Sequence, residues 1–323
     1  MKKRSIALVV LISVIALIGA GCGSDDGDVG GDDFKVAIVA PSPSNDLAFT
    51  QSIVDAANVL KDDGVVGEVA VTDGTFVIED AALAIREYAE DGYDLVIAHG
   101  SQYGGPLQEI APDFPETAFA WGTAADTFGL DNVYAYEAAS DQGGEVMGMM
   151  AAALSGNSNV GIVGPIEVGD AKLYVDGFEA GVLKQNSGAT VNINYIDSFS
   201  DTALASEAAQ SLIGNGADVM SGTAQMVVGA VGVAKDKGVL WFGTQANQTS
   251  LAPEIVVASQ VYHWEHILKD MIKKVGEGKL GGDTYKITFA NEGLVIEYND
   301  GYDLPDDVKK IGEDAIKAFK DAG

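Results

Sequence analysis

The chain has 323 residues, and its 48 acidic and 19 basic residues give a formal net charge of −29 at pH 7. Because a polyanion requires a basic surface, this charge argues against a nucleic-acid partner. One cysteine excludes a disulfide framework and any CxxC-type zinc or redox site, and three histidines without an HExxH pattern lead us to expect no metal and no cofactor.

The first predicted element is a signal peptide over residues 1–21. Three basic residues precede an apolar run, residues 6–18, that is too short for a typical membrane-spanning helix. The Gly-Ala-Gly that precedes Cys22 resembles a bacterial lipobox, although a glycine stands where an aliphatic residue is usual. We therefore expect lipidation of Cys22 and an extracytoplasmic protein anchored to the cell membrane, with a plain secretory signal as the alternative. The Gly- and Asp-rich residues 22–33 predict a flexible, lipidated tether.

From Lys35 onward, short β-branched runs alternate with segments of helical periodicity. The first series predicts strands at 36–40, 69–71, 95–98 and 118–121, with helices at about 47–60 and 79–90. The second series predicts strands at 160–163, 191–195 and 218–220, with helices at 173–183 and 204–213. Such alternation is typical of parallel sheets with helical crossovers.

Two helix–strand joints are similar and predict two lobes. Residues 92–100 (GYDLVIAHG) have a counterpart in residues 216–222 (GADVMSG), although helix–strand joints can resemble one another by chance. Ligands bind beyond the carboxyl ends of strands in such sheets, so we expect a shared cleft between the lobes. Its predicted walls are rich in aromatic and amide side chains, which suit a flat polar molecule; they comprise 45–51, 100–105, 136–137, 164–170, 198–201, 222–225 and 243–247.

Five segments also carry a resemblance to a known family. In chain order they are Asp46–Thr50 (DLAFT), Phe114–Ala120 (FPETAFA), Gly177–Gly181 (GFEAG), Tyr195–Asp201 (YIDSFSD) and Gly216–Val219 (GADV). Together they resemble the basic membrane protein (BMP) family of lipoproteins, the substrate-binding components of nucleoside-type ABC importers. The resemblance extends from about Lys35 to Leu294.

The resemblance implies an α/β fold of the type I periplasmic-binding-protein class, in which two parallel-sheet lobes flanked by helices are joined by hinge crossovers. We expect residues 34–140 plus about 244–275 in the N-terminal lobe, and residues 141–243 plus about 276–323 in the C-terminal lobe. The resemblance also implies a lipid-anchored solute-binding protein that closes on its ligand and delivers it to an ABC permease with its ATPase. It does not imply an enzyme. A nucleoside-processing enzyme and a ligand-sensing lipoprotein that does not transport are the alternatives.

By the same resemblance, Phe49 and Phe199 sandwich a purine ring from opposite lobes, and Thr50 contacts the ring. Core packing is the alternative for both phenylalanines. Asp46 and Asp201 accept ring N–H groups or cap helices. The complete predicted ligand-binding set is Asp46, Phe49, Thr50, Ser101, Tyr103, Tyr136, Phe199, Asp201, Gln225, Gln245 and Trp264.

Two departures from the family pattern bear on the ligand. The loop whose first carboxylate clamps ribose in the family has Gln245 and Asn247 in place of carboxylates, and Tyr262 stands where the family has a lysine. Trp264 follows, as in a branch of the family associated with free purine bases, where it would fill the space of ribose; packing beneath the start of a helix is the alternative. We therefore expect a nucleobase or a similar flat heterocycle, with a nucleoside second.

Overall fold

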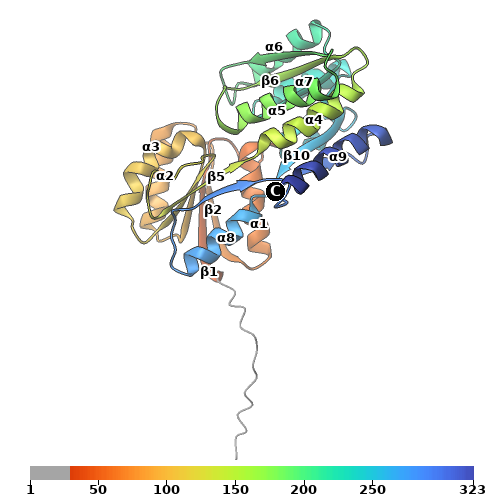
Figure 1. Ribbon diagram of the computed structural model, residues 1–323. Helices are drawn as coiled ribbons and strands as arrows, with labels where there is room; N and C mark the ends of the chain where they lie inside the picture. Colours follow the sequence, from red (N-terminus) through yellow and green to blue (C-terminus); the bar gives the residue numbers. More distant parts are fainter. Residues whose placement is uncertain (1–29) are drawn as a thin grey trace, which may run out of the picture.

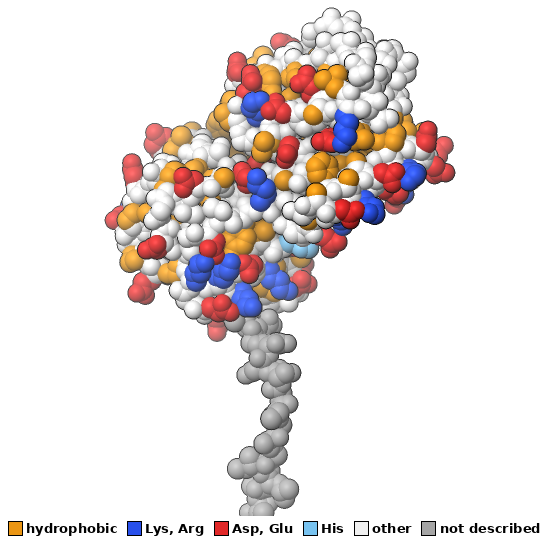
Figure 2. All heavy atoms as spheres, in the orientation of Figure 1, with side chains coloured by type: hydrophobic (Ala, Val, Ile, Leu, Met, Phe, Trp, Pro, Cys, Tyr) orange, Lys and Arg blue, Asp and Glu red, His pale blue; other side chains and the backbone are white. Residues whose placement is uncertain are grey.

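A computed structural model describes residues 30–323 of the chain, which form two α/β lobes joined by three crossings (Figure 1). The predicted signal peptide, Cys22 and nearly all of the predicted tether lie outside the described residues. Within residues 30–323, no helix has both the length and the apolar character needed to cross a membrane. Acidic side chains are spread over both lobes on the face shown in Figure 2, in keeping with the net charge.

The first lobe contains a six-stranded sheet in the order β11-β5-β4-β3-β1-β2, and all its pairs are parallel. Its strands are β1 (Gly31–Val39), β2 (Val66–Thr72), β3 (Leu95–His99), β4 (Ala118–Gly122), β5 (Val133–Ala138) and β11 (Thr284–Ile287). Its helices are α1 (Phe49–Asp62), α2 (Ile78–Glu90), α3 (Gly104–Ile110) and α8 (Glu265–Gly276), with short 3-10 turns at Ser101–Tyr103 and Ala111–Asp113.

Helices cover both faces of this sheet, which explains the continuous apolar runs of its strands. On one face, α2 and α3 pack against β1 and β3 through residues such as Ile85, Leu107 and Val39. On the other face, α1 and α8 pack against the same strands through residues such as Ile53 and Leu268. The sheet is therefore buried between two layers of helices.

The second lobe contains a six-stranded sheet in the order β12-β10-β9-β8-β6-β7. Its strands are β6 (Asn159–Gly164), β7 (Thr190–Tyr195), β8 (Val219–Gly222), β9 (Leu240–Gln245), β10 (Val256–Tyr262) and β12 (Leu294–Tyr298). Strand β12 is antiparallel to β10, and the other pairs are parallel. The helices are α4 (Ser140–Leu154), α5 (Gly169–Gln185), α6 (Thr202–Gly214), α7 (Val227–Lys237) and α9 (Asp306–Ala322), with a 3-10 turn at Thr249–Leu251. The predicted fold of two parallel-sheet α/β lobes is confirmed.

Two of the three crossings between the lobes differ from expectation. The first, from β5 to α4, lies at the expected position near residue 140. The second was expected near residue 243 but comes after Tyr262, because β10 pairs with β9 and β12 in the second sheet. The third was expected near residue 275 but comes after Ile287, because β11 adds to the edge of the first sheet beside β5.

Backbone hydrogen bonds tie the three crossings to one another. The N–H of Ala139 donates to the carbonyl of Ile287 at 2.9 Å, which links the first crossing to the third. The N–H of His263 donates to the carbonyl of Gly293 at 2.8 Å, which links the second to the third. The connection between the lobes is therefore one hydrogen-bonded unit.

Candidate ligand-binding cleft

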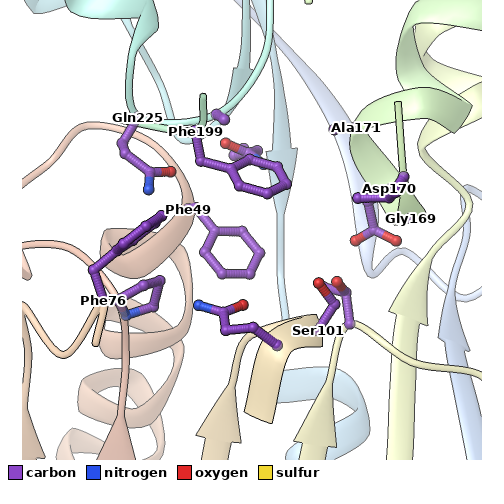
Figure 3. A pocket seen from close by; sticks show the side chains of 14 residues that line it. Phe49, Phe76, Ser101, Gly169, Asp170, Ala171, Phe199 and Gln225 are labelled. Atoms are coloured by element: carbon purple, nitrogen blue, oxygen red, sulfur yellow. The ribbon is translucent and has the colours of Figure 1, made fainter. Parts of the chain in front are cut away.

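A cleft of about 480 Å³ lies between the two lobes, at the carboxyl ends of their strands (Figure 3). The first lobe contributes Pro41, Phe49, Phe76, Ser101, Gln102 and Thr123. The second contributes Val168, Gly169, Asp170, Ala171, Phe199, Ala224, Gln225 and Gln245. Five of the predicted ligand-binding residues therefore lie together here: Phe49, Ser101, Phe199, Gln225 and Gln245.

Phe49 is the first residue of α1, and its ring is supported by a buried aromatic stack. The ring centroids of Phe49 and His99 are 4.0 Å apart at an interplanar angle of 21°. The Nε2 of His99 lies 3.3 Å from the carbonyl oxygen of Phe49, and its Nδ1 lies 2.6 Å from the hydroxyl of Tyr136. Since a carbonyl can only accept, Nε2–H donates and Nδ1 accepts from the tyrosine. Burial lowers the pKa of His99 to about 3, so this support is neutral at physiological pH.

Phe199 comes from the second lobe, in the turn between β7 and α6. Its side chain is half-buried, and its carbonyl accepts the backbone N–H of Met226 at 3.0 Å. Figure 3 shows the rings of Phe49 and Phe199 directed into the same space, with Phe76 beside them. The cleft thus has aromatic surfaces on both lobes.

The two predicted aspartates, Asp46 and Asp201, bond to helix N-termini and do not line the cleft. The Asp46 carboxylate accepts the backbone N–H groups of Thr50 and Gln51, both at 3.1 Å. The Asp201 carboxylate accepts those of Ala203 at 3.0 Å and Leu204 at 2.9 Å. Both interactions are those of helix caps, the second of the two roles that the sequence left open.

Four other predicted residues are fully buried behind the walls of the cleft: Thr50, Tyr103, Tyr136 and Trp264. The hydroxyl of Tyr103 donates to the carbonyl of Thr75 at 2.8 Å, and Thr50 shares a hydrogen bond with Ser42 at 2.7 Å. The indole N–H of Trp264 donates to the hydroxyl of Ser52 at 2.9 Å. Tyr136 and Trp264 support the Phe49–His99 stack from behind, since the ring of Trp264 meets that of Tyr136 edge-on at 5.1 Å. These residues shape the site from outside the cavity.

The polar lining comes equally from both lobes, with Ser101, Gln102 and Thr123 from the first and Asp170, Gln225 and Gln245 from the second. Gln245 ends β9 with a φ of 72°, and Ala224 lies just beyond β8 with a φ of 70°, a left-handed conformation that side chains rarely adopt. Gln245 is buried, and its Oε1 has no hydrogen-bond partner among the described residues. At Ala224 and Gln245 the chain therefore changes direction sharply at the rim of the cleft.

Asp170 and Phe76 line the cleft although the predicted ligand-binding set omits them. Residues 164–170 were expected near the cleft, but the aspartate in that segment carried no pattern of its own. Asp170 is only 5% exposed. Burial and the neighbouring Glu137 carboxylate raise the pKa of Asp170 to about 8, while a hydrogen bond from the backbone of Ala138 and the charge of Lys286 act against the rise.

The comparisons with known proteins agree with this architecture. The model of the Bmp family, described as ABC transporter substrate-binding protein PnrA-like, matches residues 34–317. A purine-binding protein of Brucella abortus is 27% identical over 241 residues, which cover 75% of this chain and 67% of the relative. A transcriptional activator protein of Bacillus subtilis is 28% identical over 282 residues, which cover 86% of each.

A solved structure supports the fold itself. The solute-binding protein of an ABC transporter from Conexibacter woesei superposes with a TM-score of 0.74 at 24% identity. The match covers 90% of this chain and 97% of that protein. The likeness therefore extends over both lobes.

Proposed function

The chain belongs to the Bmp family of PnrA-like substrate-binding proteins of ABC transporters, and from this premise we propose that it captures a purine base and delivers it to an ABC permease. A nucleoside is the second ligand class. The observation that supports a purine most directly is the pair Phe49 and Phe199, which reach into one cleft from opposite lobes. Stacking on an aromatic side chain contributes roughly 1–3 kcal/mol per base.

The mechanism is closure about the hinge. A ring held between Phe49 and Phe199 touches both lobes only when they approach each other, so the ligand stabilises the closed state by those contacts. The His99 stack fixes the Phe49 ring before the ligand arrives, which lowers the entropy lost on binding. The ligand leaves chemically unchanged.

A thermal-shift screen of purine and pyrimidine bases and nucleosides tests this proposal. A purine at a hundredfold excess over its Kd is expected to stabilise the protein by about 2.7 kcal/mol. The variant Phe199→Ala should fold normally and lose most of this response, because the half-buried ring lines the cleft. A response to sugars or amino acids alone would overturn the assignment, and release of a base from adenosine would identify an enzyme instead.

We also propose that Cys22 carries a lipid that holds the protein on the outer side of the cell membrane. The lipobox-like sequence before Cys22 supports this. In cells, the wild-type chain should sediment with membranes, and Cys22→Ser should appear in the soluble fraction. Equal membrane association of both proteins would rule out the anchor.

A sensing role is the second candidate function, favoured by the similarity to a protein named as a transcriptional activator. Transport and sensing differ in the fate of the captured ligand, which a transport protein releases to its permease and a sensor retains while it signals. Deletion of the gene should abolish uptake of radiolabelled purine if the protein serves a permease. Normal uptake together with altered gene expression would favour sensing.

A further inference from the structure

One ionisable side chain faces the ligand space. Among the described residues that line the cleft, Asp170 alone carries an ionisable group. It is the second residue of α5, the helix after β6, and it is 95% buried. In Figure 3 its carboxyl group lies across the cavity from the rings of Phe49 and Phe199.

The carboxyl group of Asp170 is held in place but incompletely bonded. Its backbone carbonyl accepts the hydroxyl of Ser140 at 2.7 Å, which ties the residue to the first crossing of the hinge. The side-chain atom Oδ2 is buried and has no hydrogen-bond partner in residues 30–323. A buried polar atom without a partner destabilises a fold, so such atoms call for an explanation, and a ligand in the cleft can supply the partner.

The surroundings of Asp170 favour its neutral form. The charged groups that face it are Glu137 on β5, Asp141 on α4 and Lys286 on β11. The ammonium of Lys286 lies 2.5 Å from the carboxylate of Glu137, so this cation is already paired. The hydroxyls of Tyr136 on β5 and Tyr262 on β10 are the other titratable groups, and both are neutral at physiological pH because burial raises their pKa.

Building on the proposed function, we propose that Asp170 contacts the ligand directly, its Oδ2 hydroxyl donating a hydrogen bond to an acceptor atom on the edge of a neutral heterocycle. A pKa near 8 keeps this proton in place at neutral pH. Gln245 needs a donor instead, because its buried Oε1 has no partner among the described residues and can only accept a hydrogen bond. The matching ligand therefore presents both a ring nitrogen or carbonyl oxygen and an N–H group, as purine bases do.

Other ligand charges fit this arrangement poorly. An anionic ligand would be repelled by Glu137 and Asp141. A cationic ligand would draw Asp170 into its carboxylate form, and its affinity would then rise with pH. The direction of the pH dependence therefore separates a neutral heterocycle from a cation.

Calorimetric titration of the full chain with adenine, from about pH 6 to about pH 9, tests the inference. If binding requires the protonated acid, the Kd of the wild-type protein should rise about tenfold between pH 7 and pH 9. Asp170→Asn keeps a permanent donor of the same shape, so it should bind within about threefold of wild type and lose the pH dependence. Asp170→Ala should bind about tenfold more weakly at pH 7.

Asp176→Asn is the matched control, since Asp176 lies on the same helix, is exposed and pairs with Lys172 outside the cleft. It should retain the wild-type pH profile. If adenine binds but both Asp170 variants behave as wild type at every pH, the inference is overturned and the proposed function stands. Affinity that rises with pH would overturn the donor role. If neither adenine nor any other purine binds the wild-type protein, the proposed function fails, and the inference fails with it.

Discussion

At the scale of single residues, two buried titratable groups have opposite effects on stability. The pKa of His99 is lowered by burial, so the unfolded chain binds more protons than the folded one below the ordinary histidine pKa, and stability rises with pH there. The pKa of Asp170 is raised by burial, so the folded chain binds more protons between about pH 4 and about pH 8, and stability falls as pH rises through this range. The contributions of His99 and Asp170 to the pH dependence of stability can be separated by comparing variants.

Asp170→Asn is therefore expected to gain stability relative to wild type as pH rises from about 4 to about 8. The difference in the free energy of unfolding should grow by at most about 1.4 kcal/mol per pH unit, the value for one proton. Urea unfolding of both proteins without ligand at several pH values measures it. Asp176→Asn should show no such divergence. A constant difference across the range would mean that Asp170 titrates normally in the folded protein.

Sequence patterns locate the cleft but not the direction of each side chain. Phe199 was placed by the family resemblance, and Gln225 and Gln245 by their position after strands; all three line the cleft. Tyr103 and Tyr136 were also expected in the walls yet are buried, because Tyr103 lies in the 3-10 turn after β3 and Tyr136 lies within β5, and both side chains are directed into the core. The significance of Asp170 depends on Glu137 and Lys286, which are far away in the sequence, so no local pattern could indicate it.

At the scale of elements, close contact between α4 and α5 organises the second lobe. A Cβ added at Gly144 or Gly148 on α4 would lie 2.5 or 2.1 Å from a backbone oxygen of α5. A Cβ added at Gly177 or Gly181 on α5 would lie 2.3 or 2.1 Å from a backbone oxygen of α4. Glycines on each helix therefore let the two backbones touch.

Gly148→Ala should destabilise the protein by about 1–3 kcal/mol, because the new methyl group would overlap the carbonyl oxygen of Phe178 and push the helices apart. Gly232→Ala on α7 is the matched control, since nothing lies within 4 Å of its Cβ position. That change should stabilise by about 0.5–1 kcal/mol through helix propensity. Urea unfolding measures the change in the free energy of unfolding for both variants. Equal changes would show that α4 and α5 can move apart without loss of stability.

Hydrophobic periodicity predicted seven of the twelve strands and four of the nine helices within residues 30–323, but neither the late strands nor their assignment to lobes. The strands β9, β10 and β11 have no feature that indicates which sheet they join, and the partner of β11 is β5, more than a hundred residues earlier. A boundary that depends on long-range pairing is not visible in a local pattern. The expected crossings near residues 243 and 275 were wrong for this reason.

At the scale of the whole molecule, the three crossings determine how the lobes can move. Their backbone hydrogen bonds, from Ala139 to Ile287 and from His263 to Gly293, join them into one unit, so closure is expected to bend all three together. Gln248 adds a contact between the lobes, donating to the carbonyl of Leu47 at 3.3 Å. The lobes should therefore move as rigid bodies about the hinge.

Small-angle X-ray scattering should detect this closure as a smaller radius of gyration when adenine saturates the protein. The ring must touch Phe49 and Phe199 together for the ligand to favour the closed state, because a ligand that contacts one lobe alone shifts no equilibrium between open and closed forms. Phe199→Ala, at a concentration of adenine that still saturates it, should compact less than wild type. Equal compaction in both proteins would mean that other contacts across the cleft close it. Binding by the wild-type protein with no change in its radius of gyration would mean that the lobes are already closed before the ligand arrives, and the hinge mechanism would then have to be abandoned.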